Sequence, residues 1–201
     1  MDNMINLKIT QDGKEHDIVL PTDKTAFENI TVIQITDSVC PMLKEMDIND
    51  VDVSALNNFA VQLRQISDIG KLPKLNAVLS ANQCSSVDQA ILLAERLEHF
   101  NLDAEIKNYT DLVYDELENV IGGRQAEELR LCPDIEKYGR ILQQGYNAEF
   151  TEYGMVTRDD FQPMDAPWQD ESEVMDRYAD HMKKTSLCKN KLVILFLRPY
   201  R

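Results

Sequence analysis

Apolar and polar side chains alternate through the first twenty residues, on either side of Asp12-Gly13. Alternation with a period of two is typical of half-buried strands, and an Asp-Gly pair favours the type I′ turn of a hairpin. We therefore expect two antiparallel strands that meet at this turn. The elements expected in a first α/β module, residues 1–52, are strands at Met4–Ile9 and His16–Leu20, a short helix capped by Thr22 or Asp23 and ending by Asn29, a strand at Thr31–Thr36, and a linker at Pro41 and Asp47–Asp52.

Helical spacing replaces this alternation after residue 52. Ser54 is a good N-cap, and Leu56 and Leu63 fall on one helical face behind it. Two further helices are expected at Leu72–Leu79 and at Val87–Leu97, the second capped by Ser85 or Ser86. Because the connections are short, the three helices should pack together as a helical domain of residues 53–99.

The last module, residues 100–201, mixes strands and helices. Its expected elements are a strand at Phe100–Ile106, a helix from Thr110 to Gly122-Gly123, a helix at Pro133–Gln144, a hairpin at Ala148–Thr157, a loop at Asp159–Glu173, a helix at Ser172–Lys184 and a strand at Lys191–Leu197. The helix from Thr110 should bury Leu112, Val113, Leu117, Val120 and Ile121 and expose Asp111, Asp115, Glu116 and Glu118. The whole chain is thus expected to be an α+β protein of three small modules.

Negative charge is concentrated in the last module. The chain holds 35 acidic and 21 basic residues, a formal net charge of −14. Residues 103–180 contain 20 acidic and 7 basic residues, whereas residues 181–201 contain six basic residues and no acidic one. This sign argues against direct binding of nucleic acid. Composition alone leaves two interpretations open, a functional acidic surface or acidity that serves solubility.

The sequence carries no recognisable catalytic or metal-binding motif. The three histidines are scattered, the four cysteines form no CxxC pair, and no phosphate loop, dinucleotide fingerprint or nucleophile elbow is found. We therefore expect a protein that is not an enzyme and holds no metal or cofactor. The polar start of the chain and an apolar run of only six residues, Leu192–Leu197, favour a cytoplasmic protein outside the membrane.

Several stretches together resemble the ArdA family of antirestriction proteins. The helix at Ser54–Leu63, the acidic helix at Tyr109–Ile121, the element Tyr138-Gly139-Arg140-Ile141-Leu142 and the hairpin at Glu149–Val156 occur in that family's order. The resemblance covers residues 53–158 and does not extend to residues 1–50 or beyond about Phe161.

The resemblance implies an elongated homodimer, of the kind carried by mobile genetic elements, that mimics bent B-form DNA in the DNA-binding channel of type I restriction-modification enzymes. It places dimerisation and antirestriction action at Ile121–Pro133, and implies that Arg140 is an internal partner of a carboxylate and that Gly139 permits close packing. With Asp103 and Glu105 added from the outer face of the expected strand, the phosphate-mimicking residues are Asp103, Glu105, Asp111, Asp115, Glu116, Glu118, Glu127, Glu128, Asp134, Glu136, Glu149 and Glu152. The structural residues of the motif are Tyr138, Gly139, Arg140, Leu142 and Gly154.

Three alternatives remain beside this interpretation. The target can be another DNA-targeting defence complex, such as a CRISPR nuclease. The chain can be a non-catalytic adaptor that binds a partner through residues 1–52 and is acidic only for solubility. The third alternative is a hydrolase with an unrecognised carboxylate site, which would need a pocket with two or more carboxylates around one histidine.

Overall fold

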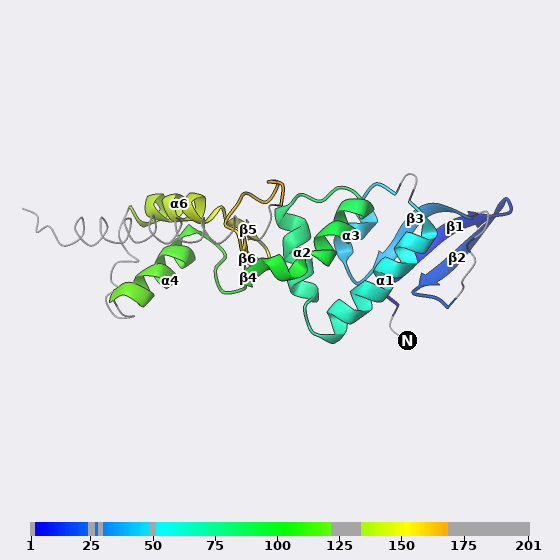
Figure 1. The fold of residues 1–201 in the computed structure, drawn as a ribbon, viewed down its shortest axis with the longest axis horizontal. Helices are drawn as coiled ribbons and strands as arrows, with labels where there is room; N and C mark the ends of the chain where they lie inside the picture. The colour runs from blue at the N-terminus through cyan, green and yellow to red at the C-terminus, as the bar shows by residue number, and fades with distance from the viewer. Residues whose placement is uncertain (1–2, 24–26, 28–29, 49–50, 122–133, 169–201) are drawn as a thin grey trace, which may run out of the picture. The chain divides into compact units, whose positions relative to one another are not determined.

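The computed structural model describes residues 3–23, 27, 30–48, 51–121 and 134–168 (Figure 1). Helices and two three-stranded sheets make up this part of the chain, so the expected α+β fold of several small modules is confirmed. The chain divides into two compact units, one of Met1–Leu102 with Thr151–Tyr153 and one of Asp103–Phe150 with Gly154–Arg201. Residues 1–52 and 53–99, expected as two modules, lie together in the first unit.

The first unit is built on an antiparallel sheet with strand order β2-β1-β3. Its strands are β1 (Ile5–Gln11), β2 (Lys14–Leu20) and β3 (Ile30–Ser38). The hairpin is confirmed, because Gln11 pairs with Lys14 across the turn. Asp12 and Gly13 have φ values of 52° and 76°, as a type I′ turn requires. Most of the helix expected before Asn29 lies outside the described residues.

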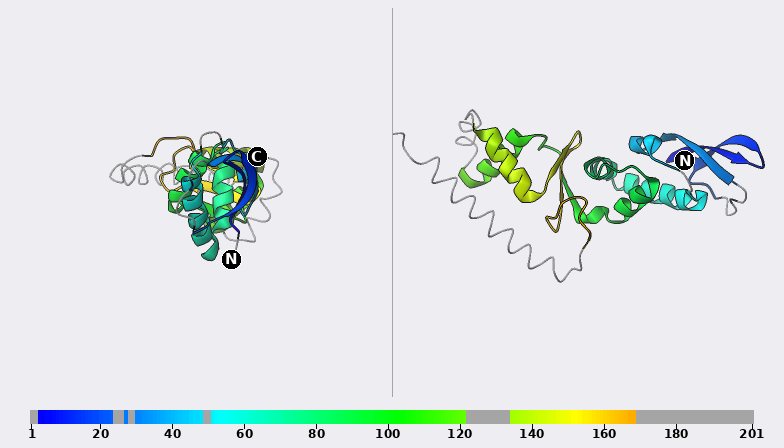
Figure 2. Two further views of the ribbon diagram at one scale, coloured as in Figure 1. Left: turned by 90° about the vertical axis from the view of Figure 1, so that its right-hand side faces the viewer. Right: turned by 90° about the horizontal axis from the view of Figure 1, so that it is seen from above.

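Helix α1 (Val53–Asp68) lies along one face of this sheet (Figure 2), and η1 (Pro41–Glu45) contacts β3. The other helices of the unit, α2 (Leu72–Ala81), α3 (Val87–Glu95) and η2 (Leu97–His99), pack against one another, and α2 also packs against α1 and η1. The sheet buries Ile5, Leu7 and Ile9, and α1 buries Leu56, Phe59 and Leu63. Ser86 caps α3 as expected, by accepting from the N–H of Gln89. The cap expected at Ser54 is wrong, because Asp52 caps α1 and accepts a hydrogen bond from the Ser54 N–H over 3.1 Å.

The second sheet has strand order β4-β6-β5. Its strands are β4 (Phe100–Asp103), β5 (Glu149–Thr151) and β6 (Gly154–Arg158), and the helices of the second unit are α4 (Tyr109–Ile121) and α6 (Ile135–Tyr146). The hairpin expected at Ala148–Thr157 corresponds to β5 and β6. The strand expected to reach Ile106 ends three residues earlier, because the Asp103 side chain accepts from the Glu105 N–H over 3.1 Å and turns the chain.

Helices α4 and α6 pack against each other and enclose the core of the second unit (Figure 1). The buried members of this core are Ile106, Leu112, Val113, Leu117, Ile135 and Leu142. Gly139 lets the two helices approach closely, since a Cβ at this position would lie 2.5 Å from the carbonyl oxygen of Tyr109. Helix α6 ends at Asn147, which adopts the left-handed conformation with φ of 48°.

Residues 159–168 after β6 form neither helix nor strand, as expected for the predicted loop. The helix expected at Ser172–Lys184 and the strand expected at Lys191–Leu197 lie outside the described residues.

Candidate partner-binding surface

Four exposed carboxylates lie close together in the second unit. Asp103 and Glu105 are at and after the end of β4, and Asp115 and Glu118 are on α4. Burial, followed by the negative charges of Asp103, Glu116 and Glu118, raises the pKa of Asp115 above its ordinary value. The Asp103 carboxylate at the end of β4 and the Asp115 carboxylate on α4 are therefore near enough to repel each other. We call Asp103, Glu105, Asp115 and Glu118 the acidic patch.

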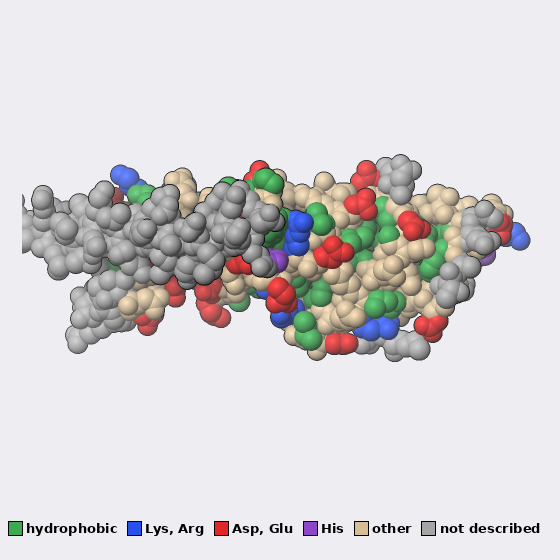
Figure 3. Space-filling view, in the orientation of Figure 1, with side chains coloured by type: hydrophobic (Ala, Val, Ile, Leu, Met, Phe, Trp, Pro, Cys, Tyr) green, Lys and Arg blue, Asp and Glu red, His purple; other side chains and the backbone are tan. Residues whose placement is uncertain are grey.

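Helical geometry presents the two α4 members of the acidic patch together. Asp115 and Glu118 are three positions apart, so their side chains project from neighbouring points of the same helical face. Within the part of the chain that the structure describes, no lysine or arginine forms an ion pair with any of the four patch carboxylates. Figure 3 shows acidic side chains on the surface of this region. The patch therefore presents negative charge that its described surroundings do not pair.

Glu116 does not belong to this surface, and the prediction that it is exposed is wrong. Only 8% of Glu116 is exposed, and its Oε2 atom accepts a hydrogen bond from the Tyr146 hydroxyl over 3.1 Å. Burial and the charge of Glu116 raise the pKa of Tyr146. The spacing explains the burial, since Glu116 is four residues after Leu112 and three after Val113 and faces α6 with them. Glu116 connects two helices instead of presenting charge.

Asp111 is engaged at the start of α4. Its Oδ2 atom accepts from the Lys107 backbone N–H over 3.1 Å and from Asn108 Nδ2 over 2.7 Å. In return, the Asp111 N–H donates to Asn108 Oδ1 over 3.0 Å. This reciprocal arrangement resembles a capping box, in which the side chains satisfy backbone groups that a helix start leaves open. Asp111 therefore has a structural role that the sequence interpretation did not include.

The remaining predicted acidic residues are distributed over other elements. Asp134, Glu149 and Glu152 are exposed, and Glu152 belongs to the first unit. Glu136 is exposed and its Oε1 atom lies 2.7 Å from Arg140 Nη2. Glu127 and Glu128 lie outside the described residues, as does most of the segment Ile121–Pro133 to which the resemblance assigned dimerisation.

The predicted structural residues differ in where they lie in the second unit. Arg140 has a carboxylate partner, Glu136, but on the surface and not internally, with the Arg140 guanidinium 4.7 Å above the centre of the Tyr109 ring. Leu142 is buried and Tyr138 is half-buried. Gly154 has φ of +137°, and a Cβ there would overlap the carbonyl oxygen of Asp103. Gly154 thereby holds β6 against the end of β4, where the acidic patch begins.

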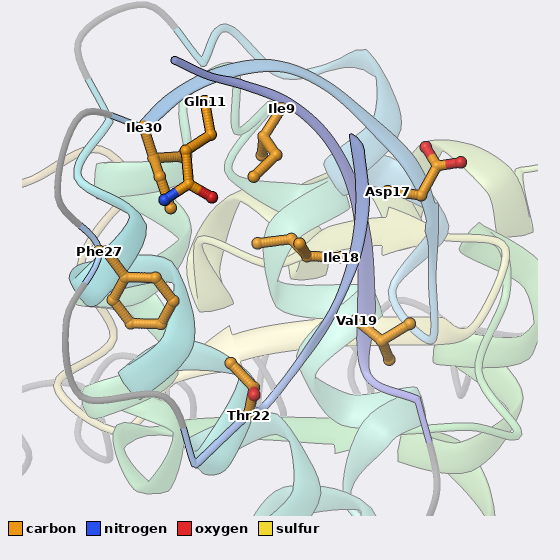
Figure 4. Close-up of a pocket in the computed structure, with 8 residues that line it drawn as sticks. All are labelled: Ile9, Gln11, Asp17, Ile18, Val19, Thr22, Phe27 and Ile30. Atoms are coloured by element: carbon orange, nitrogen blue, oxygen red, sulfur yellow. The ribbon is translucent and has the colours of Figure 1, made fainter. Parts of the chain in front are cut away.

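Two buried thiols and a cavity lie in the first unit. Burial raises the pKa of Cys40 to about 12, and burial also raises the pKa of Cys84, so both thiols are protonated at neutral pH. The cavity has a volume of about 420 Å³ and lies at the inner face of the β1–β2 hairpin (Figure 4). Ile9, Ile18 and Phe27 point into it, whereas Asp17 points away.

The comparisons supply no relative for this chain, which matches no protein-family model, no curated protein and no solved structure. Among the described residues, no three or more histidine, cysteine, aspartate or glutamate side chains are grouped so that they could hold a metal ion. The described helices include none with the length and apolar character needed to cross a membrane.

Proposed function

We propose that this protein is a non-catalytic antirestriction protein that occupies the DNA-binding site of a type I restriction-modification enzyme. The observation that carries the proposal is the acidic patch, four exposed carboxylates at the end of β4, just after it and on α4, without an ion-pair partner among the described residues. The resemblance of residues 53–158 to the ArdA family supports the choice of target. In this proposal the protein is cytoplasmic and homodimeric.

Carboxylates on a folded scaffold suit the imitation of a phosphate backbone. A basic DNA channel binds its ligand largely through charge neutralisation and release of counterions, so a fixed negative surface in that channel gains free energy from the same source. The patch is built on a helix and a strand, which limits the ordering cost of binding. Each pair of like charges at helical spacing lowers the stability of the helix by a few tenths of a kcal/mol. Binding to a basic channel offsets this repulsion. Binding should therefore weaken steeply as salt rises.

The exposed side chains narrow the set of phosphate mimics. Glu116 is excluded from the set because it is buried, and Asp111 is excluded because its carboxylate caps the start of α4. Glu136 is set aside because it forms an ion pair with Arg140. The proposed mimics among the described residues are Asp103, Glu105, Asp115, Glu118, Asp134, Glu149 and Glu152.

Restriction of unmodified DNA by a purified type I enzyme tests the proposal. Addition of the protein should protect the DNA, and protection should decline between about 50 and 200 mM salt, the range in which phosphate contacts weaken. The double variant Asp115→Lys/Glu118→Lys should inhibit roughly tenfold less or weaker still, because it places positive charge opposite a basic channel.

A control with the same change of net charge is available in the first unit. Glu45→Lys/Glu95→Lys alters two exposed acidic side chains outside the patch and should keep nearly full inhibition. Equal loss in both double variants would mean that only total charge matters, and no protection by the unaltered protein would reject this target. Protection against a CRISPR nuclease alone would reassign the target to another DNA-targeting complex.

The cavity of the first unit favours a second candidate, a protein-interaction adaptor. Ile9, Ile18 and Phe27 form an apolar recess next to the hairpin, which can receive an apolar side chain of a partner. If the protein is an adaptor, Ile18→Lys should abolish binding of its partner. If the acidic patch inhibits restriction, the same variant should inhibit as well as the unaltered protein.

A further inference from the structure

Arg158, the last residue of β6, is buried completely. Its side chain is 0% exposed, although most arginines keep their charge in water. The guanidinium binds the Asp160 carboxylate with both ends, from Nε to Oδ1 over 3.0 Å and from Nη2 to Oδ2 over 2.6 Å. Such a two-point ion pair is stronger and more specific than a single contact. The only buried ion pair among the described residues thus lies at the beginning of the irregular segment.

The same guanidinium holds the far end of that segment. Arg158 Nη1 donates to the carbonyl oxygens of Pro163 over 3.0 Å and of Ala166 over 2.5 Å. The Trp168 ring stacks on the guanidinium with its centre 3.8 Å from Cζ, a cation–π contact. One side chain therefore contacts the segment near its start, in its middle and at its end.

Two further contacts complete the arrangement. Asp160 Oδ1 also accepts from the Gln162 backbone N–H over 3.1 Å. Asn147, which ends α6, donates from Nδ2 to the Phe161 carbonyl oxygen over 2.6 Å. Phe161 has φ of +53°, in the left-handed region of backbone conformation. A residue other than glycine adopts this conformation at a cost in free energy, and it persists because the surrounding contacts hold it.

We propose that residues 159–168 form a clasp that opens and closes as one unit around the Arg158 guanidinium. The segment has no helix or strand of its own. Two backbone hydrogen bonds form turns within it, from the Phe161 N–H to the Arg158 carbonyl oxygen over 3.1 Å and from the Ala166 N–H to the Pro163 carbonyl oxygen over 3.0 Å, and the side-chain contacts hold these turns to the rest of the unit. Because most of these side-chain contacts share one charged group, removal of that group releases them together instead of one at a time. When the clasp is closed, it fixes Trp168 against the second unit. The proposal does not rest on the proposed function.

The chain provides a specific probe of this clasp, because Trp168 is its single tryptophan. Arg158→Met keeps the length of the side chain and removes its charge and donors. We expect greater quenching of Trp168 fluorescence by acrylamide, and faster hydrogen exchange of the amides of residues 159–168, by on the order of 100-fold, because one partner of a buried ion pair has been removed. Amides of α4 and α6 should exchange nearly as before.

Arg140→Met is the matched control, because Arg140 is in an exposed ion pair in the same unit. It should leave Trp168 quenching and exchange of residues 159–168 unchanged. Arg158→Lys, which keeps the charge but cannot make two-point contacts, should give an intermediate opening. Asp160→Asn removes the other charge of the ion pair and should also open the clasp. It replaces Arg158→Met as the test variant if that variant does not fold.

Three outcomes would overturn the proposal. Unchanged quenching and exchange in Arg158→Met or Asp160→Asn would show that the guanidinium does not hold the segment. Equal acceleration in α4, α6 and residues 159–168 would show that the segment has no opening of its own. Behaviour of Arg158→Lys identical to the unaltered protein would show that charge alone suffices without the two-point geometry.

Discussion

In the first unit, three ion pairs each place a lysine beside an exposed carboxylate, whereas the acidic patch of the second unit has no such neighbour among the described residues. The pairs are Lys8–Glu15, Lys44–Asp37 and Lys71–Glu98, with nitrogen–oxygen distances of 2.8, 2.9 and 2.7 Å. The described residues of the first unit include 13 acidic and 7 basic side chains, and those of the second include 12 and 4. The numbers of acidic side chains are nearly equal, and the second unit also pairs two of its carboxylates, Glu136 with Arg140 and Asp160 with Arg158. The units therefore differ less in how many carboxylates are paired than in where the unpaired ones lie, since the four carboxylates of the acidic patch belong to one part of the second unit. The proposed binding surface for a basic partner depends on where carboxylates are paired and where they are not, and composition does not reveal this.

The largest effect should come from disturbing the helix pair that supports the acidic patch. Gly139→Ala puts a Cβ 2.5 Å from the Tyr109 carbonyl oxygen and 2.6 Å from its Cβ, so α4 and α6 must separate. We expect a loss of about 2–3 kcal/mol in the free energy of unfolding of the second unit. Chemical denaturation followed by Trp168 fluorescence measures this unit.

Gly145 gives a control on the same helix. No atom lies within 4 Å of a Cβ built at Gly145, so Gly145→Ala should stabilise the second unit by up to about 1 kcal/mol through higher helix propensity. If both alanines had the same effect, close packing at Gly139 would not be what limits the approach of the helices.

A smaller effect of opposite sign is expected inside the patch. Burial and neighbouring negative charge raise the pKa of Asp115, so its ionised form destabilises the folded state at neutral pH. Asp115→Asn should therefore increase the free energy of unfolding at pH 7 by a few tenths of a kcal/mol, the scale of like-charge pairs on a helix. The gain should shrink as pH falls and Asp115 itself becomes protonated in the folded protein. A variant that is less stable than the unaltered protein at pH 7 would contradict the repulsion.

The smallest effect on stability should come from breaking an ion pair of the first unit. Its dependence on pH should be the reverse of that expected for Asp115. The hydrogen bond and charge of Lys71 lower the pKa of Glu98, so this pair contributes stability above the ordinary glutamate pKa of 4.5 and loses it as pH falls through the lower folded value. Glu98→Gln should slightly lower the melting temperature at pH 7 and leave it unchanged at strongly acidic pH. A melting-temperature difference that persists at acidic pH would mean that the pair acts through packing and not through charge.

Elements with local signals could be predicted from the sequence. Alternation around Asp12-Gly13 predicted the hairpin of the first unit because a type I′ turn and its strands depend on neighbouring residues. Helical spacing likewise predicted α1, α2 and α3. The start of α1 was not predicted, because Asp52 and Ser54 are both good capping residues and the folded structure uses Asp52.

The candidate surface was only partly predictable, because exposure of a helical residue depends on the helix that packs against it. Glu116 was placed with the exposed acids, although its spacing from Leu112 and Val113 put it on the apolar face, and that signal could have identified it. Tyr146, its hydrogen-bond partner, is thirty residues away and carried no signal. Arg158 followed by two aspartates gave no indication of burial, since the carbonyl groups around it come from irregular backbone.

The anchoring of Trp168 also limits how far the rest of the chain can reach. Residue 201 is thirty-three positions further along, and at about 3.6 Å per residue even fully extended backbone would keep it within roughly 120 Å of Trp168. The six basic side chains in residues 181–201 are consequently tethered to the unit that holds the acidic patch. When the protein is diluted, a separate partner molecule meets the acidic patch less often. The basic side chains of residues 181–201 are part of the same chain, so their effective concentration around the patch does not change on dilution.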